Sequence, residues 1–405
     1  MRIPDSEENP AAMEDVSFPK GFRAWGLACG IKKNGKPDLG VLVSEPPAQV
    51  FSAFTRNAVK AAPVLFDQKV ASGGGRLSHV LVNSGNANAC TGTQGYEDVL
   101  AEAAALREAA SPKGEVMVSS TGVIGEYLPM DKIRAGITRL FSSGETFAPF
   151  IHSIMTTDTF EKKAQKALVL DGAEVRLGGV AKGAGMIRPN MATMLSYITT
   201  DLDLHAGYRE TFLAFVEKTF NSISVDGDMS TNDTALLIAN GASGVRYQDL
   251  SLSARKTFDE GLRGLMEDLA KLIIRDGEGA TKLVTIETKG ARSIEDAKAV
   301  CQAIANSPLV KTAFFGGDAN WGRVLAAAGY SGAELVPEKT ALEFCGVKVM
   351  ARGGALSYDE DDLAARMKAK DVSVKVDLGL GDGSWIYWTC DLSYDYVKIN
   401  AAYRT

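Results

Sequence analysis

The chain has 405 residues, of which 45% are apolar and 23% charged, and its formal net charge is −6. This composition is typical of a globular protein with ample core, and the acidic charge argues against a nucleic-acid-binding surface. No apolar run approaches the roughly 18–20 residues of a membrane span. The first twenty residues carry five acids and lack the apolar region of a signal peptide, so we expect a cytoplasmic protein.

Cysteine and histidine are few and scattered. The five cysteines are Cys29, Cys90, Cys301, Cys345 and Cys390, and the three histidines are His79, His152 and His205. Without a C-x-x-C pair, neither a disulfide framework nor a thiolate metal site is expected. We expect no metal and no bound cofactor. The scarcity of histidine favours a nucleophile that supplies its own base over a His-dependent triad.

Taken in order, the chain alternates predicted strands and helices, which indicates an α/β protein. Asn34-Gly35 marks the tip of a hairpin between the apolar runs 25–31 and 39–43. The predicted strands are 79–82, 115–119, 166–171, 174–177, 194–200, 234–239, 283–287, 372–376 and 385–390. The predicted helices are 96–110, 131–141, 206–222, 251–275, 293–306 and 324–328. Residues 83–92, rich in Asn and Gly, are expected to form a tight loop.

Residues at the end of the predicted strand 115–119 can stabilise a negative charge. The Thr121 hydroxyl and the Gly122 amide would be two convergent donors, which is what a tetrahedral oxyanion needs. A plain cap between the strand and the helix 131–141 explains the same residues equally well.

The glycine-rich run 182–195 contains a candidate nucleophile. A small residue, Ala192, precedes Thr193 there. Threonine is a poor nucleophile unless a base lies beside it, and one solution makes it a chain terminus whose own amine takes the hydroxyl proton. An α-amine has a reference pKa of roughly 7.7–8.0, so it is partly unprotonated near neutrality. Cleavage between Ala192 and Thr193 would create that terminus, although a simple turn entering a strand accounts for the same residues.

Two further acidic features have open interpretations. Asp226, Asp228 and Asp233 suggest a cation site at first glance, but their spacing fits no EF-hand loop. Glu278, between two glycines, is either a ligand for an amine or an ordinary turn acid.

From about residue 21 to residue 405, the sequence resembles the glutamate N-acetyltransferase/ornithine acetyltransferase family of the arginine pathway. The motifs that carry this resemblance, in the order of the family, are 83–92, 119–125, 155–159, 182–195, 224–234, 276–282, 317–323 and 388–405.

The resemblance implies a self-cleaving precursor with an α chain of residues 1–192 and a β chain of residues 193–405, two of each usually forming a heterotetramer. It implies an α/β fold of stacked sheets flanked by helices, with a nucleophile geometry similar to that of N-terminal-nucleophile hydrolases. Thr121 and Gly122 correspond to the oxyanion donors. The residues that correspond to substrate contacts are Thr156, Lys182, Thr193, Glu278, Asn400 and Thr405.

The implied reaction moves an acetyl group from N-acetylornithine to glutamate through an acetyl ester on Thr193, in a ping-pong sequence. Lys182 would bind a substrate carboxylate, and Glu278 would meet the side-chain amine of ornithine. Some members of the family also use acetyl-CoA as the donor, and the motifs do not separate the two kinds. Two alternatives are an aminopeptidase or amidase of similar architecture and a non-catalytic amino-acid-binding protein.

Overall fold

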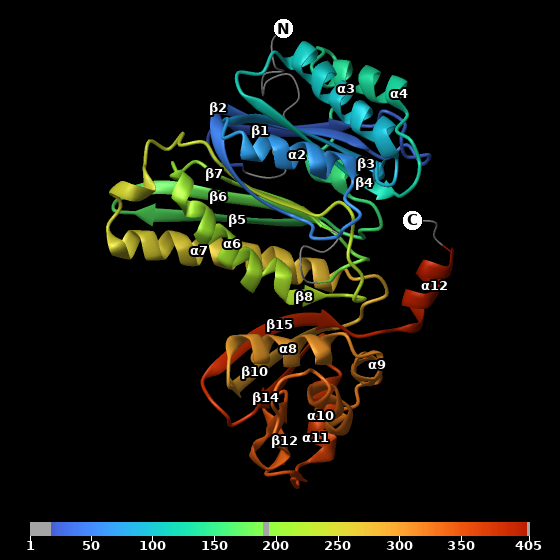
Figure 1. Ribbon diagram of the computed structural model, residues 1–405, viewed down its shortest axis with the longest axis vertical. Coiled ribbons are helices and arrows are strands. Elements are labelled where there is room, and N and C mark those ends of the chain that lie inside the picture. The colour runs from blue at the N-terminus through green and yellow to red at the C-terminus, as the bar shows by residue number, and fades with distance from the viewer. Residues whose placement is uncertain (1–17, 189–193, 403–405) are drawn as a thin grey trace.

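The computed structural model describes residues 18–188 and 194–402. In these ranges the chain forms two sheets, one above the other in Figure 1, each with its own helices. We call the upper part, which contains the first sheet, the sandwich, and the lower part, which contains the second, the C-terminal lobe. No helix within the described ranges has both the length and the apolar character needed to cross a membrane.

The sandwich contains an eight-stranded sheet in the order β4-β3-β2-β9-β7-β6-β5, with β1 paired to β2. Its strands are β1 (Phe22–Leu27), β2 (Leu39–Phe54), β3 (Leu77–Asn86), β4 (Glu115–Val123), β5 (Lys162–Leu170), β6 (Ala173–Lys182), β7 (Leu195–Thr200) and β9 (Thr234–Ala239). Its helices are α2 (Ala62–Ser72), α3 (Gly92–Ala110), α4 (Met130–Leu140), α5 (Phe150–Ile154), α6 (Arg209–Lys218) and α7 (Leu252–Arg275).

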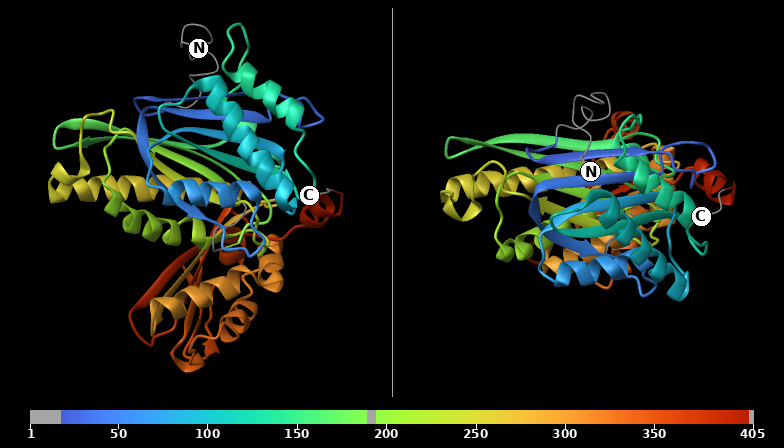
Figure 2. Two further views of the ribbon diagram at one scale, coloured as in Figure 1. Left: turned by 45° about the horizontal axis from the view of Figure 1, so that its top comes forward. Right: turned by 90° about the horizontal axis from the view of Figure 1, so that it is seen from above.

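The long strand β2 joins the two halves of this sheet. Its first part pairs with β3 and its last part with β9, and the register shifts between Val43 and Ala48. Apolar residues of both halves, such as Val80 and Leu236, share one core, so the halves face each other as stacked layers (Figure 2). Helices α3 and α4 cover one outer face, and α6 and α7 cover the other. The predicted α/β fold of stacked sheets flanked by helices is confirmed.

Local sequence explains the inner elements of the sandwich. All six residues of β9 are buried, as expected for a strand covered on both faces. The apolar stripe of α7, which includes Phe258, Leu262 and Leu269, faces the core, and the helix begins where the Ser251 side chain accepts a hydrogen bond from the Ala254 amide. A Cβ at Gly179 of β6 would lie 2.9 Å from Leu269 Cδ1, so glycine lets α7 pack closely on the sheet.

The C-terminal lobe contains a seven-stranded sheet in the order β13-β12-β11-β14-β10-β15-β8. Its strands are β8 (Ile223–Ser224), β10 (Leu283–Ala291), β11 (Ala341–Phe344), β12 (Val347–Ala351), β13 (Gly354–Ala355), β14 (Asp371–Asp377) and β15 (Gly383–Cys390). Its helices are α8 (Ile294–Ala305), α9 (Pro308–Gly316), α10 (Trp321–Gly329) and α11 (Glu360–Met367), and α12 (Tyr394–Ala402) follows β15. Ser293 caps α8, because its side-chain oxygen accepts a hydrogen bond from the Asp296 amide.

One element prediction was wrong, and two others misplaced the end of a strand. The predicted helix 206–222 is divided into η1 (Ala206–Tyr208), α6 and η2 (Phe220–Ser222). Thr219 leaves the helical conformation, with φ −123° and ψ −86°, and this break accompanies the burial of Phe220 in the core. The strand predicted at 39–43 continues as β2 to Phe54, because its two prolines lie where the pairing passes from one half of the sheet to the other. In addition, β3 extends into the predicted loop as far as Asn86.

Candidate active site

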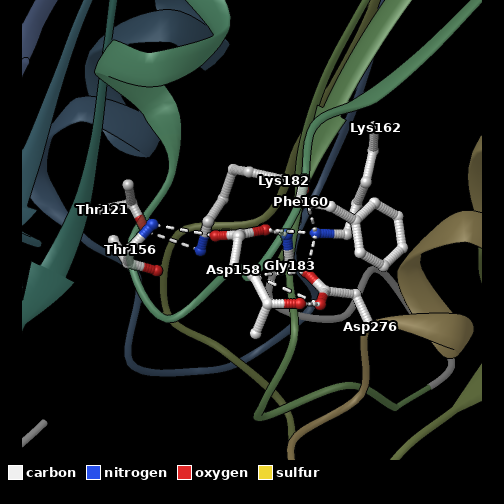
Figure 3. Close-up of polar contacts among 9 residues, drawn as sticks. Thr121, Thr156, Asp158, Phe160, Lys162, Lys182, Gly183 and Asp276 are labelled. Carbon is white, nitrogen blue, oxygen red and sulfur yellow. Dashed lines mark hydrogen bonds and ion pairs between the residues drawn. The ribbon is translucent and has the colours of Figure 1, made fainter.

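The predicted oxyanion donors, Thr121 and Gly122, lie at the end of β4. The parallel register pairs them with Ser84 and Gly85 of β3. Gly122 has φ +136°, and a Cβ there would lie 2.3 Å from the Gly85 carbonyl carbon, so only glycine fits this approach. The Thr121 side chain points toward the end of β6 (Figure 3).

The predicted cation Lys182 is the last residue of β6 and is buried. Its Nζ donates a hydrogen bond of 3.2 Å to Thr121 Oγ1, so two predicted site residues from distant parts of the chain are in contact. Burial lowers the pKa of the Lys182 ammonium, while the nearby carboxylate of Asp158 opposes this shift. A buried lysine with one hydroxyl partner is well suited to bind a carboxylate.

Thr156 lies in the loop that follows α5, and Asp158 fixes this loop. The Thr156 amide donates to Asp158 Oδ2 at 2.8 Å, and the Gly183 amide donates to Asp158 Oδ1 at 2.7 Å (Figure 3). One carboxylate therefore joins the Thr156 loop to the residue after Lys182. The sequence placed Asp158 in a polar motif but did not indicate this role.

Glu278 and Asn400, which are far apart in the sequence, are also in contact. Asn400 Nδ2, on α12, donates to Glu278 Oε2 at 3.0 Å. The Glu278 amide donates to the Ala184 carbonyl at 2.9 Å, and a Cβ at Gly185 would lie 2.5 Å from the Glu278 carboxylate. The glycine-rich segment after Lys182 therefore lies directly against Glu278.

Three predicted residues, Ala192, Thr193 and Thr405, lie outside the described residues. The nearest described residue after the proposed cleavage point is Met194. Its amide donates to Asp233 Oδ1 at 3.0 Å, and its carbonyl accepts from the Thr234 amide at 3.0 Å. The next residue, Leu195, pairs directly with Lys182 in the β6–β7 ladder. Met194 therefore enters β7 beside the end of β6.

The acids of the segment 224–234 bind backbone amides. Asp226 accepts hydrogen bonds from the Met186 amide at 2.7 Å and the Ile187 amide at 2.9 Å. Asp233 is fully buried, and its Oδ2 has no hydrogen-bond partner in the described part of the chain. Burial raises the pKa of Asp226 to about 6 and that of Asp233 well above its ordinary value. These two carboxyl groups therefore hold the described residues on both sides of the segment 189–193.

A second cluster was missed by sequence reasoning. Lys162 forms ion pairs with Asp158 and Asp276, and all three side chains are buried. Asp158 and Asp276 stood in motifs of the predicted site, but their partner Lys162 did not. Because these residues are 4 and 114 positions from Lys162, only the fold brings all three together.

Chemically, this arrangement offers a cation in contact with a hydroxyl group, and an acid, Glu278, whose charge acts on that cation. Lys182 suits a carboxylate, Thr121 suits a developing oxyanion, and Glu278 suits an amine. Within residues 18–188 and 194–402, no three His, Cys, Asp or Glu side chains gather in an arrangement that could hold a metal ion.

Known proteins match this chain over nearly its whole length. The model of the ArgJ family matches residues 23–405. The arginine biosynthesis bifunctional protein ArgJ of Geobacter sulfurreducens is 47% identical over 392 residues, which cover 95% of this chain and 99% of the relative. The protein of the same name from Listeria monocytogenes is 44% identical over 394 residues, covering 96% and 98%.

A solved structure, ornithine acetyltransferase of Mycobacterium tuberculosis in complex with ornithine, is 40% identical. The match covers 44% of this chain and 94% of the chain in that structure, with a TM-score of 0.35. The resemblance on which the predicted site rests is confirmed by the family match and the identities of the relatives. The chain therefore belongs to the ArgJ family of arginine biosynthesis, and it is an enzyme of the acyltransferase class.

Proposed function

We propose that this protein cleaves itself between Ala192 and Thr193 and then uses Thr193 to move an acetyl group from N-acetylornithine to glutamate. The observation that carries the proposal is the contact of Lys182 with Thr121 next to the start of β7. Because Met194 is bonded to residue 193, the proposed nucleophile is covalently attached to the strand that pairs with Lys182.

In the first reaction, Thr193 Oγ attacks the carbonyl carbon of Ala192 and the peptide C–N bond breaks, giving an ester and a free amine. Water then hydrolyses the ester, which leaves a carboxylate on Ala192 and a free Thr193 amine and hydroxyl. Residues 1–192 and 193–405 become separate chains. The hydrogen bond from the Met194 amide to Asp233 Oδ1 supports a fixed geometry on the C-terminal side of the peptide bond that is cleaved.

In the second reaction, the Thr193 amine accepts the hydroxyl proton as Oγ attacks the acetyl carbon of N-acetylornithine. The amide C–N bond breaks, ornithine leaves with that proton on its amine, and the acetyl group remains on Oγ as an ester. The amine of glutamate then attacks this ester, so N-acetylglutamate leaves and the hydroxyl is restored. Thr121 and Gly122 would hold the oxyanion in both steps.

The substrates fit the charges of the site. Both are amino acids, so both bring a carboxylate that Lys182 can bind, and ornithine brings an amine that Glu278 can bind. Thr156, Asn400 and Thr405 would add adaptable polar contacts. We further propose that acetyl-CoA is a possible second donor, that no bound cofactor or metal takes part, and that two α and two β chains form a cytoplasmic heterotetramer.

The decisive experiment compares the wild-type protein with Thr193→Ala. Wild-type protein should give two chains by intact mass and should transfer acetyl groups from N-acetylornithine to glutamate faster than to water. Thr193→Ala should remain one chain of 405 residues without transfer activity. The control Thr257→Ala, at an exposed position of α7, should behave as wild type. Cleavage of Thr193→Ala, or full activity in an uncut chain, would overturn the proposal.

A further inference from the structure

A buried ion cluster lies beside the candidate site. The ammonium of Lys162, at the start of β5, lies between the carboxylates of Asp158 and Asp276 (Figure 3). Its Nζ is 2.6 Å from Asp158 Oδ1 and also contacts Asp276 Oδ2. The ring of Phe160 covers the ammonium, with its centroid at 5.1 Å.

Burial limits what this cluster can do. The side chains of Lys162, Asp158 and Asp276 are 0%, 0% and 2% exposed. Their charged atoms are already paired with one another and with backbone amides, so we infer that they act on the reaction through the residues they hold. A buried ion pair is weak evidence for stability, because desolvation offsets most of the attraction. Stability alone therefore does not explain why these three charged side chains are buried together.

Asp158 connects two of the segments that carry predicted substrate residues. Its two oxygens accept from the Thr156 amide at 2.8 Å and from the Gly183 amide at 2.7 Å. Its carboxylate is also the largest favourable charge acting on the Lys182 ammonium. The position of Thr156 and the charge of Lys182 therefore depend on one carboxylate, which Lys162 holds in place.

Asp276 connects the third segment. It lies at the end of α7, two residues before Glu278, and accepts from the Thr159 amide at 2.9 Å and from the Thr159 hydroxyl. With the bond from the Glu278 amide to the Ala184 carbonyl, this contact fixes the turn that carries Glu278. Lys162 is thus the common partner of two carboxylates that serve different parts of the site.

We propose that Asp158, Lys162 and Asp276 form a positioning cluster that fixes Thr156, Lys182 and Glu278 relative to one another for substrate binding. The proposal rests on the proposed function, because these three residues are taken as substrate contacts. Asp158 and Lys162 precede position 193, whereas Asp276 follows it. The cluster therefore joins one site across the two chains that cleavage would produce.

Association of those two chains does not depend on the cluster. Strand β6 pairs with β7 over six residue pairs, and β2 pairs with β9 over another six. Each pairing joins a strand before position 193 to a strand after it. Loss of the cluster is therefore expected to weaken substrate binding without separating the chains, a result that a purely structural role would not give.

Asp276→Asn tests the proposal with little change in volume. We expect KM for N-acetylornithine to rise about 10-fold or more, with kcat within about 3-fold of wild type, because ground-state and transition-state binding are lost together. The two chains should still form and co-elute. The matched control is Asp371→Asn, which breaks an exposed ion pair with Arg275, the residue next to Asp276, and should leave KM unchanged.

Equal KM values for Asp276→Asn and Asp371→Asn, with an active wild type, would overturn the positioning role and leave the proposed function intact. An inactive wild type would overturn the proposed function itself. Should Asp276→Asn not fold, Thr159→Val removes only the hydroxyl donor to Asp276 and keeps every charge. This variant should raise KM for N-acetylornithine about 3-fold. An unchanged KM would overturn the proposal.

Discussion

The sandwich and the C-terminal lobe differ in what their cores contain. Among residues 283–390, Lys311 is the one buried Asp, Glu, Lys or Arg side chain, and Lys282, directly before β10, donates from its ammonium to the Phe314 and Met367 carbonyls. The sandwich buries many ionisable groups, among them Asp67, Glu102, Asp158, Lys162, Lys182, Asp233 and Asp276. Because buried charge contributes little to stability, its concentration in one part indicates where the chemistry lies.

The contrast between the two cores predicts its largest change in stability at Glu102 in α3. Glu102 is a buried acid whose two carboxyl oxygens have no hydrogen-bond partner among the described residues. Burial, with Asp98 and Asp67 nearby, raises the pKa of Glu102 from 4.5 to about 8. Because this pKa is higher in the folded protein than in the unfolded chain, the unfolding free energy of the protein keeps its full value below pH 4.5. It falls as the pH rises through 8.

Glu102→Gln should therefore gain stability relative to wild type by about 1.4 kcal/mol per pH unit, reaching about 4–5 kcal/mol at pH 8. Urea unfolding across this pH range measures the change. The exposed neighbour Glu97→Gln serves as the control and should show no such slope. A flat difference between Glu102→Gln and wild type would contradict the burial of an uncompensated acid.

The second test compares one buried lysine from each part of the molecule, Lys162 and Lys311. Lys162→Met leaves two carboxylates without their shared cation and should cost about 3–5 kcal/mol of unfolding free energy. Lys311→Met in the lobe loses bonds to the Thr389 hydroxyl and the Cys390 carbonyl, neither of which is charged, and should cost about 1–3 kcal/mol. Urea unfolding at pH 7 gives both values, and equal costs would remove the contrast between the two cores.

Much of the fold could be predicted because its signals are local. The stripe of α7, the run of β9 and the cap at Ser293 each depend on residues close in sequence. The extent of β2 and the break at Thr219 could not be predicted, because both depend on packing against distant strands and helices. In each case tertiary context overrides local preference.

In the candidate site, too, some residues could be predicted from the sequence and others could not. Family motifs indicated Thr121, Lys182, Glu278 and Asn400, and the fold places them in contact in pairs. The carboxyl groups that hold this site were not predicted. Asp233 meets Met194 across 39 residues and Asp276 meets Lys162 across 114, and no periodicity in a single sequence encodes such distances.

The third test concerns the glycine at the end of β4. Gly122→Ala places a Cβ against the backbone of Gly85 at a φ of +136°, so the predicted oxyanion donor must shift. Loss of one oxyanion donor typically lowers the rate about 10²–10³-fold, and we expect this loss in kcat. Gly125→Ala is the control, because its φ is +83° but nothing lies within 4 Å of its Cβ. Equal activity in the two variants would remove Gly122 from the oxyanion hole.

The smallest expected effect is at Gly185, which lies against the Glu278 carboxylate. The Cβ of Gly185→Ala would lie 2.5–2.7 Å from the carboxyl atoms of Glu278, which form the mobile end of a side chain. The carboxylate should move aside at little cost in folding, and its bond to Asn400 should be lost. We expect KM for N-acetylornithine to rise about 10-fold with kcat within about 3-fold, as for an interaction equal in the ground and transition states.

Gly264→Ala in α7 is matched to this change, because its Cβ would lie 2.6 Å from Nζ of Lys166, again the mobile end of a charged side chain. Lys166 pairs with Asp268 on the surface and is not part of the predicted site, so KM should not change. Steady-state kinetics with both substrates separates the two cases. A rise in KM confined to Gly185→Ala would assign amine recognition to Glu278, because displacing a charged group matters to catalysis only where that group meets the substrate.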